Sequence, residues 1–98
     1  MAVHRVEFEW DPSKRDSNLE KHGIDFVLAR FVFDDPDHLT ELAMMTPYGE
    51  VRWKAVGQVE DLTICVIFTD RGARRRIISA RRARRDERER YRAGAQSA

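Results

Sequence analysis

The spacing of hydrophobic residues changes at Leu39, and that change limits the possible fold more than any other feature. Before it, Ile24, Val27 and Phe31 recur at the three- and four-residue spacing of an amphipathic helix. After it, apolar residues alternate with polar ones or form short runs, as strands do. A chain that begins with helices and continues with strands is expected to pack those helices on one mostly antiparallel sheet, which is an α+β fold.

The N-terminal third is predicted to hold a short strand and two helices. Apolar residues alternate with glutamates over 6–10, which indicates a strand with one buried face. Asp11-Pro12 is a strong helix start, and Gly23 ends that helix as a left-handed C-terminal residue. Asp25 is the expected N-cap of a second helix, which the Asp-Asp-Pro sequence at 34–36 ends.

Four more strands and a last helix are predicted after residue 38. Turn residues at 46–49 and 70–72 separate the alternating segments. The strands are expected at 39–45, 51–55, 62–69 and 75–80, and the helix at 82–92. The predicted order is therefore β-α-α-β-β-β-β-α. Ninety-eight residues are enough for one domain, 1–98, whose last residues, 93–98, are expected to be a frayed tail.

Charge is distributed very unevenly along the chain. Residues 71–92 hold eleven arginines and three acids, a local charge of +8, whereas the whole chain carries +1. Such segregation is typical of a protein that binds a polyanion. Arginine also matches phosphate geometry with a planar, bidentate fork, which lysine lacks. The sequence therefore predicts a phosphate-binding surface near the C-terminus.

The composition excludes several classes of protein. The single cysteine, Cys65, cannot form an internal disulfide, which favours a reduced, cytoplasmic setting. The longest apolar run, 64–68, is too short to span a bilayer, so no membrane partner is expected. One cysteine and three scattered histidines give no credible metal site, and no glycine-rich phosphate loop is present. We therefore expect no cofactor.

Several separate segments, in order, resemble the BrnT family of toxins. They are FEWDP, NLEKHGIDF, VFDDP, GEVRWKAVGQV and RRIISARRARRDERERY, and together they run from about Phe8 to Tyr91. The resemblance implies a RelE-like fold and a ribonuclease of a type II toxin–antitoxin module. It also implies a ribbon-helix-helix antitoxin of the BrnA type, joined to the toxin in a heterotetramer through the antitoxin dimer. Such complexes typically bind their own operator DNA, chiefly through the antitoxin.

The arginines on the last strand and its flanks are the candidates for phosphate stabilisation. Arg76 and Arg81 are favoured as catalytic contacts because they lie in the RIISAR segment that matches the family. Strict strand alternation places Arg76 on one face with Ile78 and Ala80, and Arg81 on the other with Ile77 and Ser79. Further RNA-binding candidates are Arg52, Lys54, Arg71, Arg74 and Arg75. The alternative reading is a solvated basic edge that discourages aggregation.

Metal-free RNA cleavage also needs a base for the 2′-hydroxyl proton and an acid for the leaving 5′-oxygen. The candidates for the base and the acid are His22, Glu50 and Tyr48, with Lys21 and Lys54 behind them. His22 and Glu50 both have structural alternatives. A histidine near a helix C-terminus interacts favourably with the helix dipole, and Glu50 could be half of a surface ion pair.

The arginine-rich last helix balances its own charge. Asp86 and Glu87 are expected to pair with Arg90, and Arg85 with Glu89, at three- and four-residue spacing. The helix is therefore an exposed, ion-paired surface, a nucleic-acid-binding surface or an antitoxin-docking surface. The antitoxin-contact candidates are Arg82, Arg85, Arg88 and Tyr91. Trp53 could stack on an RNA base but is more often a core residue.

Three functions fit these features. The first is an RNA-cleaving toxin, active without metal, that inhibits growth until an antitoxin covers its basic face. The second is a non-catalytic module whose arginines only neutralise phosphates. The third is a domain that docks an acidic or amphipathic protein. The weak point of the enzyme hypothesis is the lack of an unmistakable base, which a fold resemblance cannot supply.

Overall fold

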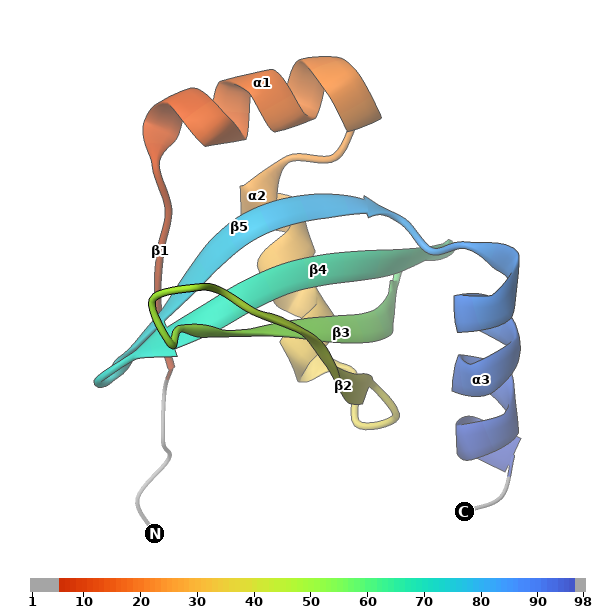
Figure 1. Ribbon diagram of the computed structural model, residues 1–98. Helices are drawn as coiled ribbons and strands as arrows, with labels where there is room; N and C mark the ends of the chain where they lie inside the picture. The colour runs from red at the N-terminus through yellow and green to blue at the C-terminus, as the bar shows by residue number, and fades with distance from the viewer. Residues whose placement is uncertain (1–5, 97–98) are drawn as a thin grey trace, which may run out of the picture.

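A computed structural model of the chain describes residues 6–96. These residues form one α+β domain with a five-stranded mixed sheet and three α-helices (Figure 1). The elements are β1 (Glu7–Glu9), α1 (Pro12–His22), α2 (Phe26–Ala29), the 3-10 helix η1 (Arg30–Asp34), β2 (Leu39–Met45), β3 (Val51–Val59), β4 (Leu62–Arg71), β5 (Arg74–Arg82) and α3 (Arg85–Gln96).

The strands lie side by side in the order β1-β5-β4-β3-β2. Strands β2 to β5 are joined by consecutive hairpins, and each of these neighbouring pairs is antiparallel. The edge strand β1 instead runs parallel to β5, with Glu7 opposite Arg74 and Glu9 opposite Arg76. The sheet is therefore mixed, and the expectation of a mostly antiparallel sheet missed this parallel edge. Parallel pairing became possible because α1 and α2 carry the chain back across the sheet after β1.

The helix ends follow the residues that predicted them. The carboxylate of Asp11 accepts a hydrogen bond from the Ser13 N–H and caps α1, and Pro12 takes the first helical position. Gly23 ends α1 with φ 71°, in the left-handed region. The Asp25 carboxylate caps α2 in the same way. The expected second helix is α-helical only to Ala29, after which it tightens into η1.

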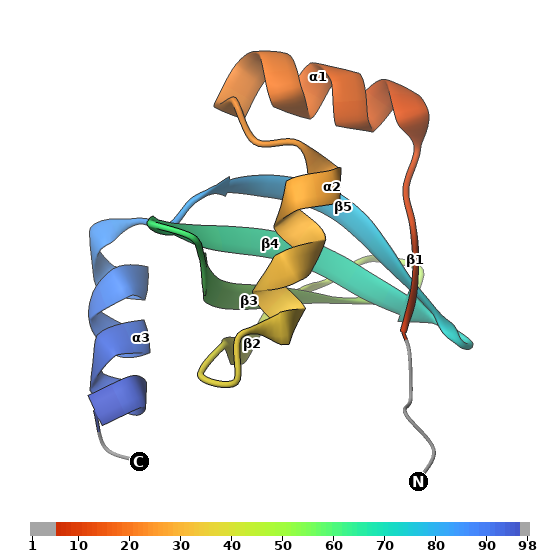
Figure 2. The ribbon, with the colours of Figure 1, turned by 180° about the vertical axis from the view of Figure 1, so that it is seen from behind.

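The two faces of the sheet are covered by different helices. On one face, α2 and η1 pack over β3, β4 and β5, as the view from behind shows (Figure 2). The buried residues there include Phe26, Val32, Ile64, Val66 and Phe68. On the opposite face, α3 covers one end of the sheet with a smaller cluster of Val56, Cys65 and Ala83, packed against Ile67 and Tyr91. The larger core is thus on the α2 side, and part of the α3 side stays open.

A β-bulge in β5 changes which residues share a face. Ile67 is opposite Ser79, whereas its neighbour Phe68 is opposite Ile77, so Ile78 is the extra residue. Ile77 and Ala80 accordingly both lie in the larger core. The sequence-based assignment of these residues to opposite faces is therefore wrong beyond Ile78.

Strand β5 is longer than predicted and α3 begins later. Because β5 extends to Arg82, that arginine belongs to the sheet, and α3 starts at Arg85. The helix continues to Gln96, so residues 93–96 of the expected tail are helical, and residues 97 and 98 lie outside the described part. Within residues 6–96, no helix is long and apolar enough to cross a membrane.

Candidate nucleic-acid interface

Six cations lie on the face of the sheet that α2 leaves open. We name this set the arginine face. On β5, Arg74 and Arg76 lie opposite Glu7 and Glu9 of β1, and the bulge at Ile78 returns Arg81 to the same face. Its members are Arg52 and Lys54 of β3, Arg71 of β4, and Arg74, Arg76 and Arg81 of β5. The structure therefore brings together the two arginines that strict alternation would have separated.

Each cation of the arginine face is close to a carboxylate. The Arg76 Nη1 atom lies 2.5 Å from Glu9 Oε2, and the Arg74 Nε atom lies 3.7 Å from Glu7 Oε2. The remaining pairs are Arg71–Glu50 at 3.1 Å, Arg52–Glu50 at 3.9 Å, Arg81–Glu87 at 2.7 Å and Lys54–Glu87 at 3.0 Å. The face is thus a network of ion pairs rather than a bare cationic surface.

Glu87 is the buried centre of this network. Its side chain is 1% exposed, and its carboxylate accepts hydrogen bonds from two nitrogens of Arg81, at 2.7 and 2.9 Å. It also accepts the backbone N–H of Arg84 at 2.7 Å. Since Arg84 precedes the first residue of α3, this contact is the glutamate half of a capping box. Glu87 therefore fixes the start of α3 against β3 and β5, and the expected pairing of Glu87 with Arg90 is wrong.

These contacts determine the ionisation of the groups around Glu87. The hydrogen bonds from Arg81 hold the pKa of the Glu87 carboxyl far below its usual range, although burial opposes this. The same hydrogen bonds raise the pKa of Arg81. Burial raises the pKa of the neighbouring Cys65 thiol to about 11, so this cysteine is protonated at neutral pH and is a poor nucleophile.

The arginine face divides into structural and accessible cations. Arg81 and Lys54 are about one-fifth exposed, and both hold the buried Glu87. Arg74 is 64% exposed and Arg71 is 52% exposed, and their partners Glu7 and Glu50 lie at the rim. Exposed ion pairs contribute little stability, so these two guanidiniums can turn toward a phosphate while their carboxylates stay nearby. Arg76, whose side chain is 28% exposed, is intermediate in exposure between the structural and the accessible cations.

Glu50 lies beside the accessible end of the arginine face. It directly precedes β3, and its Oε2 atom accepts hydrogen bonds from Arg71 at 3.1 and 3.3 Å. Its Oε1 atom lies 3.9 Å from Arg52 Nε and accepts no hydrogen bond from the described residues. Arg52 Nε is itself buried without a hydrogen-bond partner among them. Glu50 thus has one free acceptor next to two cations.

His22 lies elsewhere. It is the last residue of α1, exposed, and its side chain contacts no hydrogen-bonding or charged partner among residues 6–96. One turn earlier, Asn18 is buried, and its side-chain amide bonds both the N–H and the C=O of Ala80. Asn18 thus provides hydrogen-bond partners for the backbone of β5 at Ala80, which lies beyond the segment of β5 that β1 pairs with. No contact joins His22 to the accessible arginines among residues 6–96, and Lys21 beside it is also exposed.

Arg75 lies on the opposite face from the other candidate phosphate ligands. Its guanidinium lies over the rings of Phe33 and Phe68, 4.7 and 4.5 Å from their centroids. Two of its nitrogens bond the Asp70 carboxylate at 2.8 and 3.2 Å. Arg75 therefore packs over the edge of the larger core. Trp53 also packs against this core, which confirms the expectation that it is a core residue.

The candidate antitoxin contacts on and near α3 differ in availability. Arg82 is exposed and Arg85 is 87% exposed, the latter paired with Glu89 as predicted. Arg88 donates a hydrogen bond to the Ala83 carbonyl at 2.6 Å. The hydroxyl of Tyr91 donates to Asp35 at 2.6 Å, and its ring packs against Val56 and Cys65. Arg82 and Arg85 are accessible to a partner, although Arg85 already pairs with Glu89, while Tyr91 holds α3 in place.

Comparison with protein families identifies the chain's relatives. Residues 10–87 match the family model described as the ribonuclease toxin BrnT of type II toxin–antitoxin systems. The chain belongs to the BrnT family. The match contains every cation of the arginine face and ends at Glu87. A search of curated proteins finds no match to this BrnT chain.

Two features of this BrnT site have no direct signal in the sequence. The carboxylates that pair with Arg76 and Arg81 are 67 and 6 residues away along the chain. The bulge at Ile78 has no glycine or proline to mark it. Glu87 is the third residue of α3, where a glutamate often points back to the helix start, but Arg84 before the helix is not the serine or threonine that completes a capping box.

Proposed function

We propose that this BrnT toxin cleaves RNA internally and without metal, on the accessible end of the arginine face. The observation that carries the proposal is the gathering of Arg71, Arg74 and Arg76 on one open face, next to Glu50. Cleavage by this route transfers the 2′-hydroxyl proton to a base while the 2′-oxygen attacks phosphorus. The bond from phosphorus to the 5′-oxygen breaks, and the 5′-oxygen takes up a proton. The products are a 2′,3′-cyclic phosphate and a 5′-hydroxyl.

Each group has a defined task in this proposal. The arginines bind the phosphate and stabilise the charge that develops on its oxygens. Arg52 and Lys54 of β3 add positive charge to the same face of the sheet. Arg81 acts indirectly, because it holds the Glu87 carboxylate. Glu50 is the proposed base, because its Oε1 atom accepts no hydrogen bond from the described residues and lies among these cations. His22 is the second candidate for proton transfer.

The test is cleavage of a single-stranded RNA in the presence of EDTA. Arg71→Ala is expected to lower the rate about tenfold to a hundredfold, and Arg76→Ala by a similar factor, because each removes a phosphate ligand. Glu50→Gln is expected to lower it about a hundredfold or more. Arg30→Ala is the matched control, since Arg30 is exposed on η1 and packs on Phe31. Undiminished cleavage by the Arg71 and Arg76 variants would refute this site. Loss of cleavage in His22→Ala but not in Glu50→Gln would make His22 the base.

Membership of the BrnT family supports an antitoxin partner and an RNA substrate. We propose a BrnA-type ribbon-helix-helix antitoxin that docks on Arg82, Arg85 and Arg88, forms a heterotetramer through its own dimer and binds operator DNA in the complex. A RelE-like relationship, a cytoplasmic location and inhibition of translation belong to the same proposal. Induced expression should arrest growth, and co-expression of the adjacent antitoxin should restore it.

A binding-only module is the second candidate, favoured by the carboxylate beside every cation of the arginine face. Such a network leaves few cations free for catalysis. RNA affinity without any cleavage product would support this alternative over the enzyme.

A further inference from the structure

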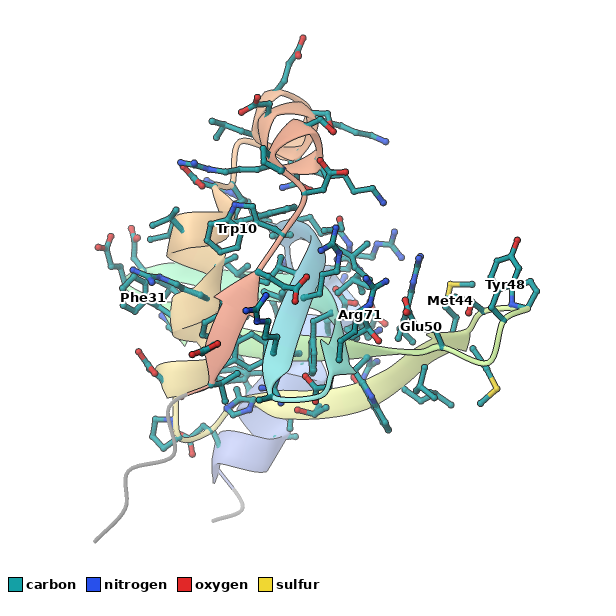
Figure 3. The ribbon with its side chains drawn as sticks, turned by 90° about the vertical axis from the view of Figure 1, so that its left-hand side faces the viewer. Trp10, Phe31, Met44, Tyr48, Glu50 and Arg71 are labelled. Atoms are coloured by element: carbon teal, nitrogen blue, oxygen red, sulfur yellow. The ribbon has the colours of Figure 1, made fainter. Side chains whose placement is uncertain are left out.

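A cleft of about 430 Å³ lies where the β2–β3 turn meets the arginine face. Figure 3 shows the turn extending from the body of the sheet, with Tyr48 near its tip and Met44, Glu50 and Arg71 successively closer to the sheet. The cleft is lined by Met44, Thr46, Pro47, Tyr48, Glu50, Arg52 and Arg71. It therefore combines an aromatic ring, a thioether and the accessible charged groups of the proposed site.

The turn that carries Tyr48 is held by three hydrogen bonds. Gly49 N–H donates to the Thr46 carbonyl at 3.0 Å, and Thr46 N–H donates to the Glu50 carbonyl at 2.8 Å. The Glu50 N–H donates to the Thr46 hydroxyl at 3.1 Å. Pro47 fixes the first central position of the turn, and Gly49 supplies the positive φ of 81° that closes it. The backbone position of Tyr48 is thus set by the turn itself.

Packing within the protein does not explain why an aromatic side chain occupies position 48. The residue is 96% exposed, and its hydroxyl makes no hydrogen bond to any residue from 6 to 96. Met44, on the adjoining strand, is 49% exposed. By contrast, Trp10, Phe33 and Trp53 pack against the larger core. An exposed aromatic on a rigid turn next to arginines is the arrangement by which proteins bind unpaired bases.

We propose that Tyr48, supported by Met44, stacks against an unpaired RNA base while Arg71 holds that nucleotide's phosphate. This inference rests on the proposed function, and it specifies the class of RNA substrate. A base inside a duplex presents only its edges, so it cannot stack on Tyr48 unless it leaves the helix. The toxin therefore selects single-stranded segments. It prefers a purine at this position, because a purine offers the larger stacking surface.

The test measures RNA binding apart from cleavage. The probe is a fluorescent single-stranded oligonucleotide with 2′-O-methyl riboses, which cannot supply the attacking hydroxyl, and the readout is anisotropy. Tyr48→Ala is expected to weaken binding about tenfold to a hundredfold, and Tyr48→Phe less than threefold, because stacking needs the ring and not the hydroxyl. Phe31→Ala is the matched control: Phe31 is 44% exposed and lies on the far side of the molecule from Tyr48 (Figure 3). The same strand annealed to its complement should bind more weakly than the single strand.

The outcomes separate this inference from the proposed function. Equal binding by Tyr48→Ala and the unmodified protein would overturn the stacking platform and leave the arginine site standing. Equal affinity for duplex and single strand would also overturn it. Tyr48-dependent binding without cleavage of unmodified RNA would support the platform and refute the enzyme. If the unmodified protein bound no RNA, both proposals would fail.

Discussion

Two glutamates on the same helix show how strongly position decides the role of a side chain. Glu89 is 62% exposed and pairs with Arg85 in solvent, where the contribution to stability is small. Glu87, two residues earlier, is 1% exposed and binds Arg81, Lys54 and the start of α3. Removing one partner of a buried ion pair leaves the other charges without compensation. Glu87 is therefore the residue on which the attachment of α3 depends most.

Glu87→Gln is expected to lower the free energy of unfolding by about 2–3 kcal/mol at pH 7, since its partners remain partly exposed. The pKa of Glu87 is lowered in the folded state from its ordinary value of 4.5. Its contribution is therefore complete above about pH 4.5 and declines as the pH falls below that value. Urea denaturation from pH 7 to pH 3 should show the gap between the two proteins narrowing.

The matched control for this variant is Glu89→Gln, which should change stability by less than about 0.5 kcal/mol. A pH-independent difference between Glu87→Gln and the unmodified protein would contradict the ionised role assigned to Glu87.

Residue types along the chain predicted local contacts well and distant ones poorly. Asp11, Gly23 and Asp25 act within two to four residues of themselves, so their roles as caps could be predicted from spacing. The pairs Asp86–Arg90 and Arg85–Glu89 were predicted for the same reason. The partner of Arg76 lies on β1, and no local pattern shows which strands become neighbours. The site could therefore be predicted as a set of arginines but not as a network.

At the scale of elements, the bulge in β5 is the feature that assembles the site. The strand positions follow from alternation, yet alternation assumes that every residue is paired. The extra residue, Ile78, lets Ile77 and Ala80 both enter the larger core. As a result Arg76 and Arg81 share the open face. The bulge brings both residues into one core through contacts with distant parts of the chain, so the local sequence could not have revealed it.

The attachment of α3 to the sheet also depends on Tyr91. Its hydroxyl donates to the Asp35 carboxylate, which also accepts the backbone N–H of Gln58 and of Asp37. These hydrogen bonds lower the pKa of Asp35 against the opposing effect of burial, and burial together with Asp35 raises the pKa of Tyr91 to about 12. Asp35, the residue that follows η1, is thereby tied to the middle of α3.

Tyr91→Phe is expected to lower the free energy of unfolding by about 1–2 kcal/mol, because it removes a hydrogen bond to a charged acceptor. Amide exchange in α3 should accelerate more than exchange in β4, since the lost contact holds the helix and not the central strand. Thermal denaturation and hydrogen exchange provide the measurements. Tyr48→Phe removes an unpartnered hydroxyl and is the control. If both variants were equally stable, the bond to Asp35 would contribute nothing to the attachment of α3.

The charge segregation of the sequence has a different meaning in the folded molecule. Residues 71–92 carry +8, yet Glu7, Glu9 and Glu50, from distant parts of the chain, lie against their arginines, together with Glu87. The arginine face therefore combines six cations with four carboxylates. Its net charge is about +2. A sequence-based expectation of a strongly cationic surface thus overstates the field that an approaching RNA encounters.

The salt dependence of RNA binding shows whether RNA encounters six free cations or a face with a net charge of about +2. Each RNA phosphate neutralised by a free cation gives a slope of about −0.7 in a plot of log affinity against log salt for a single strand. Six free cations would give a slope of about −4, whereas a net charge of +2 gives about −1.4. We expect the smaller value, since a cation that keeps its carboxylate displaces no counterion from the RNA.

Glu7→Gln releases Arg74 from its partner and should steepen the slope by about 0.7. Glu20→Gln, at an exposed glutamate on α1 away from the arginine face, should leave the slope unchanged. A slope near −4 for the unmodified protein would mean that RNA binding opens the ion pairs, and that the carboxylates move aside when the phosphate arrives.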